Sequence, residues 1–248
     1  MPLHIIGNPV SPYVRKVMAA LIIKGINFEF DPIIPFFGND EFERLSPLRR
    51  IPVLIDGETV VNDSTIICEY LDEAHGGPAM LPSGPAARAR ARWIEEYADS
   101  RIGEVIIWAL FSERAIKPRV FGDKTDEGRV AQAVDHDLPA IMDWLETQAP
   151  DNAFLFGDTP MAADLAVESF FLNAAYSRWT PDPDRWPRAT AWIARVTAHT
   201  ACQQVREWAD VMIRTPPAEQ REALKQAGAP IWAISHADTA PRRGIMAI

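Results

Sequence analysis

Short apolar runs and helical patterns alternate along the first 80 residues. The runs have the length and alternation of strands, and a Gly or a polar cluster follows most of them. The predicted strands are residues 3–6, 27–31, 51–55 and 59–61. The predicted helices are residues 13–24, 41–45 and a segment that begins at residues 62–64 and runs through Leu71. This pattern predicts an α/β domain over residues 1–80, in the order β-α-β followed by β-β-α.

Beyond a Gly- and Pro-rich linker near residue 80, only helical periodicity remains. The predicted helices are residues 86–116, 127–149, 162–177, 186–199, 201–212 and 218–227. We therefore predict an all-α helical-bundle domain over residues 86–214. Pro216-Pro217 then begins a C-terminal extension, residues 215–248. The sequence leaves open whether this extension covers the helical domain, covers a pocket or reaches another subunit.

The composition narrows the function classes. The 248-residue chain has 25 Lys and Arg against 34 Asp and Glu, so its net charge of -9 disfavours binding to nucleic acid. No apolar run is long enough to span a membrane, and the N-terminus lacks a signal-peptide pattern, so we expect a cytoplasmic protein. Two cysteines are too few for a disulfide framework. The five histidines have no metal-ligand spacing, so no metal is expected.

Ser11 is the first candidate for chemistry, because it precedes Pro12 at a predicted helix start. The N-terminus of a helix carries unpaired N–H groups and partial positive charge, which stabilise an anion. A hydroxyl at this position can donate a hydrogen bond to a thiolate held nearby. The simpler interpretation is that Ser11 only caps the helix.

Two further motifs fit a peptide-like ligand. A cis bond between Ile51 and Pro52 would leave the Ile51 backbone free to pair with such a ligand, although an edge-strand Pro is the simpler interpretation. Asp63 and Ser64 begin a predicted helix, where they could bind the ammonium and carboxylate of an α-amino acid or serve only as caps. Glutathione has a thiol, an extended peptide backbone and a γ-glutamyl α-amino acid end, and it would use all three sites.

These residues lie in three segments: SPYVRKV (residues 11–17), SPLRRIPVL (46–54) and NDSTIICEYL (62–71). Together they resemble the cytosolic glutathione S-transferase superfamily, in its bacterial, tau- or omega-like branch with serine. The resemblance implies a thioredoxin-like N-terminal domain, a helical C-terminal domain, a homodimer and a role in detoxification. It also implies that Ser11 contacts the glutathione sulfur, Arg50 the glycine carboxylate, Ile51 with Pro52 the cysteinyl backbone, and Asp63 with Ser64 the γ-glutamyl end.

Two positions differ from the pattern of the family, which more often has Glu where this chain has Asp63. Met161 stands where the family has a Ser or Thr helix cap three residues before Asp164. We expect Thr159-Pro160 to cap an earlier helix start, with Asp164 as a structural residue.

The resemblance predicts a second-substrate pocket between the domains that takes a hydrophobic electrophile. Its candidate residues, each of which could equally pack in a core, are Pro12, Phe36, Phe37, Trp108, Phe111 and Trp179. The predicted function is transfer of the glutathione thiolate to such an electrophile. The alternatives are reduction, isomerisation or lyase chemistry with the same thiolate, and a non-catalytic protein that binds glutathione or a partner.

Overall fold

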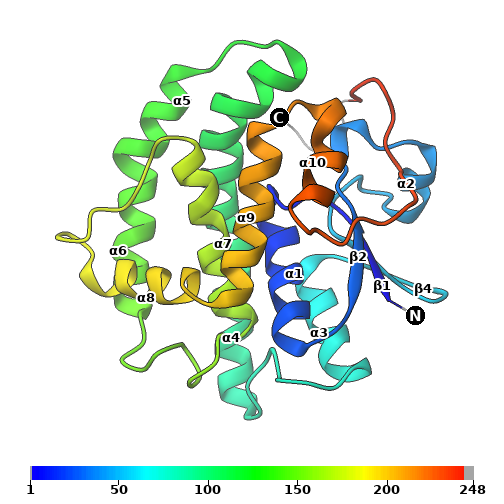
Figure 1. Ribbon diagram of the computed structural model, residues 1–248. Helices are drawn as coiled ribbons and strands as arrows, with labels where there is room; N and C mark the ends of the chain where they lie inside the picture. The colour runs from blue at the N-terminus through cyan, green and yellow to red at the C-terminus, as the bar shows by residue number, and fades with distance from the viewer. Residues whose placement is uncertain (1, 243–248) are drawn as a thin grey trace. The chain divides into compact units, whose positions relative to one another are not determined.

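The computed structural model describes residues 2–242 of the chain (Figure 1). Contacts within it form two compact units. The first unit joins the segment up to Met80 with the segment from Thr200 onward, and the second is Leu81–His199. No helix in residues 2–242 is both long enough and apolar enough to cross a membrane.

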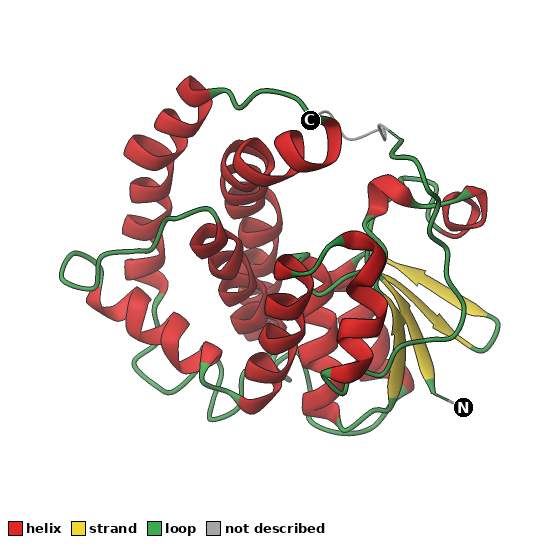
Figure 2. Cartoon of the chain, turned by 45° about the horizontal axis from the view of Figure 1, so that its top comes forward, coloured by secondary structure: helices red, strands yellow, loops and turns green. Residues whose placement is uncertain are grey.

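The first unit is built on a four-stranded mixed sheet (Figure 2). Its strands are β1 (Leu3–Ile6), β2 (Phe28–Asp31), β3 (Val53–Asp56) and β4 (Thr59–Asn62), in the order β2-β1-β3-β4. β1 pairs in parallel with β2 and antiparallel with β3, and β3 pairs antiparallel with β4. All four predicted strands are confirmed. β3 begins at Val53 rather than at residue 51, because Pro52 has no N–H to join the ladder.

Three helices complete the α/β part: α1 (Pro12–Lys24), α2 (Asp40–Leu45) and α3 (Ser64–Ala74). α1 begins after Ser11 with Pro12 at its first position and ends at Gly25, whose φ of 68° is left-handed, as the sequence predicts. α1 packs against α3. The apolar face of α1 is fully buried; it consists of Val14, Val17, Met18 and Leu21.

The second unit is built of helices joined by loops, one of which carries an isolated bridge between Phe154 and Gly157. The predicted long helix is confirmed and extends from Pro85 to Phe121 as α4 (Pro85–Tyr97), η2 (Ala98–Ile102) and η3 (Glu104–Phe121). From Ala98 onward it is wound more widely than an α-helix, with bonds that reach five residues back. The other elements are α5 (Glu127–Gln132), η4 (Ala133–Asp137), α6 (Leu138–Gln148), α7 (Ala162–Tyr176) and α8 (Pro187–Thr197). α7 packs against α4, η2, η3 and α8, so it is the central helix of this unit.

Asp164 holds the start of α7. Its carboxylate accepts hydrogen bonds from Met161 N (3.0 Å), Leu155 N (3.1 Å) and Trp192 Nε1 (2.8 Å). Burial raises the pKa of the Asp164 carboxyl, and these hydrogen bonds oppose that rise. The helix begins at Ala162 with Met161 at the cap position. The expectation of an earlier start capped by Thr159-Pro160 is therefore wrong, and the Asp164 carboxylate instead satisfies the N–H of the cap residue Met161.

The C-terminal part of the chain belongs to the first unit. α9 (Thr200–Arg214) packs against α1, and η5 (Pro217–Glu219) and α10 (Gln220–Gln226) follow, with α10 against α9. The chain then runs beside β2, as Figure 1 shows in red. Phe30 N donates to Pro230 O (2.8 Å) and Trp232 N donates to Phe30 O (2.9 Å). The tail thus covers the exposed edge of β2, which would otherwise present unpaired N–H and C=O groups.

Asp31 at the end of β2 anchors this tail. Its carboxylate is fully buried and accepts hydrogen bonds from Arg221 Nη1 (2.5 Å), His236 N (2.6 Å) and His236 Nδ1 (3.1 Å). Arg221 also donates to Trp232 O (2.5 Å). A buried carboxylate is stable only when it is paired and hydrogen-bonded, so Asp31 requires the tail in this place.

The contacts group α9 with the sheet, whereas the sequence pattern places residues 86–214 in one helical domain. The division into residues 1–80, 86–214 and 215–248 stays a prediction. Within the extension 215–248, residues up to 242 lie in the unit that holds the sheet, and residues 243–248 lie outside the described residues.

We expect Arg221→Ala to destabilise the protein by about 3 kcal/mol, because it leaves the buried Asp31 carboxylate without its main charge partner. Urea unfolding of the full chain measures the change. Arg214→Ala is the control: Arg214 is 78% exposed and lies 3.8 Å from Asp210, so its loss should change the free energy of unfolding by less than about 0.5 kcal/mol. Equal stability of the two variants would contradict the anchoring role of Asp31.

Candidate functional site

The strand register brings the three predicted ligand segments to one edge of the sheet. Ile6 pairs with Val53, and Val53 pairs with Asn62. These three residues lie in a row where β1 ends, β3 begins and β4 ends. The loop to Ser11, the Ile51-Pro52 bond and the Asp63-Ser64 pair therefore all lie directly beyond this row.

Ser11 is the N-cap of α1. Its Oγ accepts from Val14 N at 3.5 Å, which is the outer limit of a hydrogen bond. Among the described residues, the Ser11 hydroxyl proton has no acceptor. Ser11 is half-buried, so its hydroxyl can donate to a ligand atom that lies at the end of α1.

Buried polar side chains fix the loop that carries Ser11. Asn8 Nδ2 donates to Ile33 O (2.8 Å), and Asn8 Oδ1 accepts from Val10 N (3.0 Å). Arg15 Nη1 donates to the carbonyls of Pro9 and Val10, both at 2.8 Å. The sequence analysis did not identify Asn8 or Arg15 in this role. The signal was Asn before Pro at a strand end, which is typical of a braced loop.

Gly7 lets this loop lie against the other segments. Its φ is 153°, and a Cβ there would lie 2.6 Å from Val14 Cγ2 and 3.3 Å from Ile51 Cβ. A side chain at residue 7 would therefore push α1 and the Ile51-Pro52 segment apart.

The predicted cis bond between Ile51 and Pro52 is confirmed. Ile51 precedes β3, and within the described part of the chain neither its N–H nor its C=O has a hydrogen-bond partner. A buried residue with an unpaired backbone fits an extended peptide that would supply both partners.

Asp63 and Ser64 lie at the start of α3. Asp63 Oδ1 caps the helix by accepting from Thr65 N (2.9 Å) and Ile66 N (3.3 Å), and its φ is 75°. This confirms the capping interpretation and leaves Asp63 Oδ2 exposed for a cation. Ser64 is 2% exposed, and its Oγ has no hydrogen-bond partner among the described residues. An orphaned buried hydroxyl fits a carboxylate bound at the helix N-terminus.

Lys16 adds positive charge beside the same helix end. Its side chain is buried, and Nζ donates to Thr65 Oγ1 at 3.0 Å. An ammonium in the first turn of α3 strengthens a helix end that already attracts anions. The sequence analysis included Lys16 in a motif but gave it no role.

The two adjacent arginines differ sharply in environment. Arg50 is exposed, and its guanidinium has no partner among the described residues. Arg49 is buried and donates to Glu43 Oε2 (2.9 Å) and Gly38 O (2.7 Å). Arg50 is therefore the arginine whose side chain is available to an anionic ligand, and Arg49 holds the loop; the contact of Arg50 with a glycine carboxylate stays a prediction.

The predicted second-substrate residues belong to both units. Pro12, Phe36 and Phe111 are buried, whereas Phe37, Trp108 and Trp179 are partly exposed. Trp179 lies 6.5 Å from Phe171, between ring centroids, within the helical unit. The pocket that these residues would form stays a prediction.

Residues 5–79 match the family described as "Glutathione S-transferase, N-terminal domain". "Uncharacterized GST-like protein YibF" of Escherichia coli (strain K12) is 39% identical over 99 residues, which are 39% of this chain and 48% of that protein. The chain thus spans about half of that relative. "Probable glutathione S-transferase GSTU6" of Oryza sativa subsp. japonica is 28% identical over 82% of this chain and 87% of that protein. A crystal structure of a glutathione S-transferase from Rhodospirillum rubrum F11 has a TM-score of 0.76 at 22% identity and covers 89% of this chain and 99% of that one.

Residues 5–79 are thus a glutathione S-transferase N-terminal domain, and a relative that matches 82% of the chain is named as a probable glutathione S-transferase. The fold of the chain is the thioredoxin-like domain with a helical remainder that the resemblance predicted. The tau- or omega-like subtype stays a prediction. The roles of individual residues of this transferase homologue are taken up as proposals below.

We expect Ser64→Ala to leave the stability of the free protein unchanged or to raise it slightly. Ser64 Oγ is buried without a partner, so its removal abolishes a desolvation cost and no hydrogen bond. Thermal or urea unfolding without ligand measures this. Ser169→Ala is the matched control, since Ser169 is equally buried but donates to Ala166 O at 3.1 Å, and its loss should cost about 1 kcal/mol. A larger loss for Ser64→Ala than for the control would contradict the unpaired state.

Proposed function

We propose that the protein is a cytoplasmic glutathione transferase that binds glutathione at the sheet edge and transfers its sulfur to a hydrophobic electrophile. The observation that carries the proposal is the convergence of an uncommitted Ser11 hydroxyl, an unpaired Ile51 backbone and an orphaned Ser64 hydroxyl at one row of paired residues. Family relatives named as glutathione S-transferases support it.

In this proposal the tripeptide lies along the edge with each part at a matching group. The γ-glutamyl ammonium contacts Asp63, and its carboxylate contacts Ser64 and the N-terminus of α3. The cysteinyl N–H and C=O pair with the Ile51 backbone, which Pro52 presents. The glycine carboxylate pairs with the Arg50 guanidinium, which has no other partner among the described residues.

Ser11 then acts on the thiol. The hydroxyl donates a hydrogen bond to the sulfur, and the α1 N-terminus adds partial positive charge. Lowering the thiol pKa by about 2 requires about 2.7 kcal/mol of preferential thiolate stabilisation. The thiol proton leaves to solvent, the thiolate forms a C–S bond to the electrophile, and the leaving group departs with its electron pair. Ser11 forms no covalent bond.

A serine at residue 11 favours conjugation over thiol-disulfide chemistry, because a hydroxyl cannot form a mixed disulfide. The electrophile would bind against the aromatic residues of the predicted pocket. A homodimer remains part of the proposal, and the exposed apolar side chains of Leu48, Val60 and Ile66 in the sheet-containing unit support it.

We expect Ser11→Ala to raise the thiol pKa of bound glutathione by about 1 to 2 and to reduce kcat/KM at neutral pH by about 10- to 100-fold. Thiolate absorbance of the complex against pH measures the pKa, and a panel of aryl and alkyl halides measures turnover. Because the capping bond from Val14 N to Ser11 Oγ is 3.5 Å long, we expect Ser11→Ala to lower the free energy of unfolding only slightly.

Ser100→Ala is the matched control, since Ser100 is an exposed serine that bonds only its own helix at Glu96 O. An unchanged thiol pKa in Ser11→Ala would remove Ser11 from the mechanism. A wild type that binds no glutathione would overturn the proposed function as a whole.

We expect two substitutions of Asp63 to separate its capping role from ligand binding. Asp63→Asn keeps an oxygen to accept from Thr65 N and Ile66 N, so stability should hold within about 0.5 kcal/mol. Asp63→Ala loses the cap and should cost about 1 kcal/mol. Both remove the charge for the ammonium and should weaken glutathione binding about tenfold or more by calorimetry. Wild-type affinity in Asp63→Asn would show that Asp63 is a cap only.

A further inference from the structure

The tail makes a second set of contacts beyond the Asp31 anchor. Asn39 N donates to His236 O (2.8 Å), Asp238 N donates to Phe37 O (2.5 Å) and Arg242 N donates to Phe36 O (2.7 Å). Ala237 also forms a bridge with Gly38. Residues 236–242 therefore pair by backbone with η1 (Pro35–Phe37) and the start of α2.

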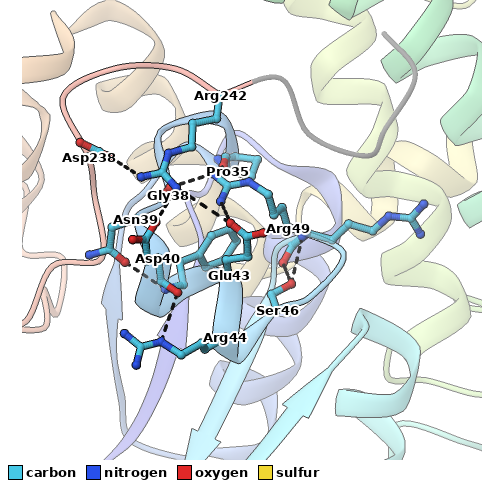
Figure 3. Close-up of polar contacts among 12 residues, drawn as sticks. Pro35, Gly38, Asn39, Asp40, Glu43, Arg44, Ser46, Arg49, Asp238 and Arg242 are labelled. Atoms are coloured by element: carbon cyan, nitrogen blue, oxygen red, sulfur yellow. Dashed lines mark hydrogen bonds and ion pairs between the residues drawn. The ribbon is translucent and has the colours of Figure 1, made fainter.

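Arg242 extends this pairing with charge (Figure 3). Its Nη1 lies 2.6 Å from Asp40 Oδ1 and 3.9 Å from Glu43 Oε2, and its Nη2 lies 2.8 Å from Asp238 Oδ2. These partners hold the Arg242 guanidinium over the first turn of α2. Arg242 and Asp40 are 202 residues apart in sequence, so their hydrogen bond connects the C-terminal tail to the start of α2.

Glu43 links Arg242 to the interior of the loop. Its Oε2 also accepts from Arg49 Nη1 at 2.9 Å. Arg49 is buried, and its backbone is in the left-handed region (φ 51°). Its Nη2 donates to Gly38 O at 2.7 Å. Figure 3 shows Arg49, Glu43 and Arg242 converging on the loop around Gly38. An α-helical turn is thus clamped between the tail on one side and Arg49 on the other.

Hydrogen bonds also connect this clamp to Arg50, the residue proposed to bind the glycine carboxylate. Arg49 N donates to Ser46 O (2.7 Å). Ser46 Oγ accepts from Arg50 N (3.0 Å) and donates to Arg50 O (2.8 Å), so both backbone groups of Arg50 are fixed. Asn62 Nδ2 adds a bond to Leu45 O (3.0 Å) from the row at the sheet edge. The Arg50 backbone is rigid while its guanidinium stays exposed.

We propose that the C-terminal segment 236–242 is a positioning element for glutathione, and that Arg242 acts through Glu43 and Arg49 to set Arg50 against the glycine carboxylate. This inference rests on the proposed function. Arg242 is a positioning residue and contacts no ligand. Loss of the clamp lets the loop fluctuate, so binding must then include the cost of ordering Arg50.

The chemistry of glutathione gives a direct test. γ-Glutamylcysteine keeps the thiol and the γ-glutamyl end but lacks the glycine that Arg50 would hold. We expect Arg242→Ala in the full chain to weaken glutathione about 3- to 10-fold and to leave γ-glutamylcysteine unchanged, both by calorimetry. Because Arg242 acts through Arg50, Arg50→Ala with Arg242→Ala should bind glutathione as weakly as Arg50→Ala alone.

A second variant that breaks the same ion pair and a matched control complete the test. Asp40→Asn breaks the same ion pair from an 80% exposed residue and should reproduce the selective loss even if Arg242→Ala folds poorly. Arg101→Ala is the matched control: Arg101 is 37% exposed against 39% for Arg242 and also contacts two carboxylates, Asp137 and Glu104. It should change neither affinity.

The outcomes are distinguishable. Wild-type glutathione affinity in both Arg242→Ala and Asp40→Asn overturns the inference and leaves the proposed function standing. Equal weakening of glutathione and γ-glutamylcysteine also overturns it, because that pattern is general damage to the site. A wild type that binds neither peptide overturns the inference together with the proposed function.

Discussion

The row of paired residues Ile6, Val53 and Asn62 is the constraint on which the candidate site depends. Strand register has a period of two, so a slip of one residue in β3 would exchange the faces on which the fully buried Val53 and Leu54 pack and would shift Ile51 relative to Gly7. The buried apolar residues of the sheet thus fix the register, and the register fixes which loops meet. Ser11, Ile51 and Ser64 therefore lie at one sheet edge because of the register of strands to which none of them belongs.

The buried Asp31 residue is the second constraint, because it connects the C-terminal tail to the loop that carries Ser11. Its side chain draws in Arg221 and His236 from the tail, while its backbone carbonyl accepts from Gly7 N at 2.9 Å. Ile33, two residues on, accepts from Asn8. One short segment after β2 therefore connects the tail to the loop that carries Ser11. A buried charge is costly to leave unpaired, so the tail is bound to the sheet by the same group that borders the site.

Local signals made the strands and the Ser11 cap predictable, because each depends on neighbours in sequence. The local signal at Ile51-Pro52 left the cis bond and an edge-strand proline both open. The tail was not predictable in the same way. Arg221 and Asp31 are 190 residues apart, and neither lies in a pattern that points to the other. The helical periodicity predicted the start of α7 at residue 162, but the expected cap by Thr159-Pro160 was wrong, because Asp164 bonds the Met161 N–H from within the helix. Which residues hold glutathione remains a prediction that only binding can test.

Arg49 and Arg50 show why sequence cannot assign such roles alone. Both are arginines in one loop, and either could reach a carboxylate. The Arg49 backbone is left-handed and its side chain bonds Gly38 O and Glu43, whereas the next residue, Arg50, is exposed. The Arg49 guanidinium is buried and bonded to acceptors within the loop, whereas the exposed Arg50 guanidinium on a fixed backbone can bind a ligand at little entropic cost. In the proposals above, Arg49 holds the loop, Arg50 binds the ligand, and the tail acts through Arg49.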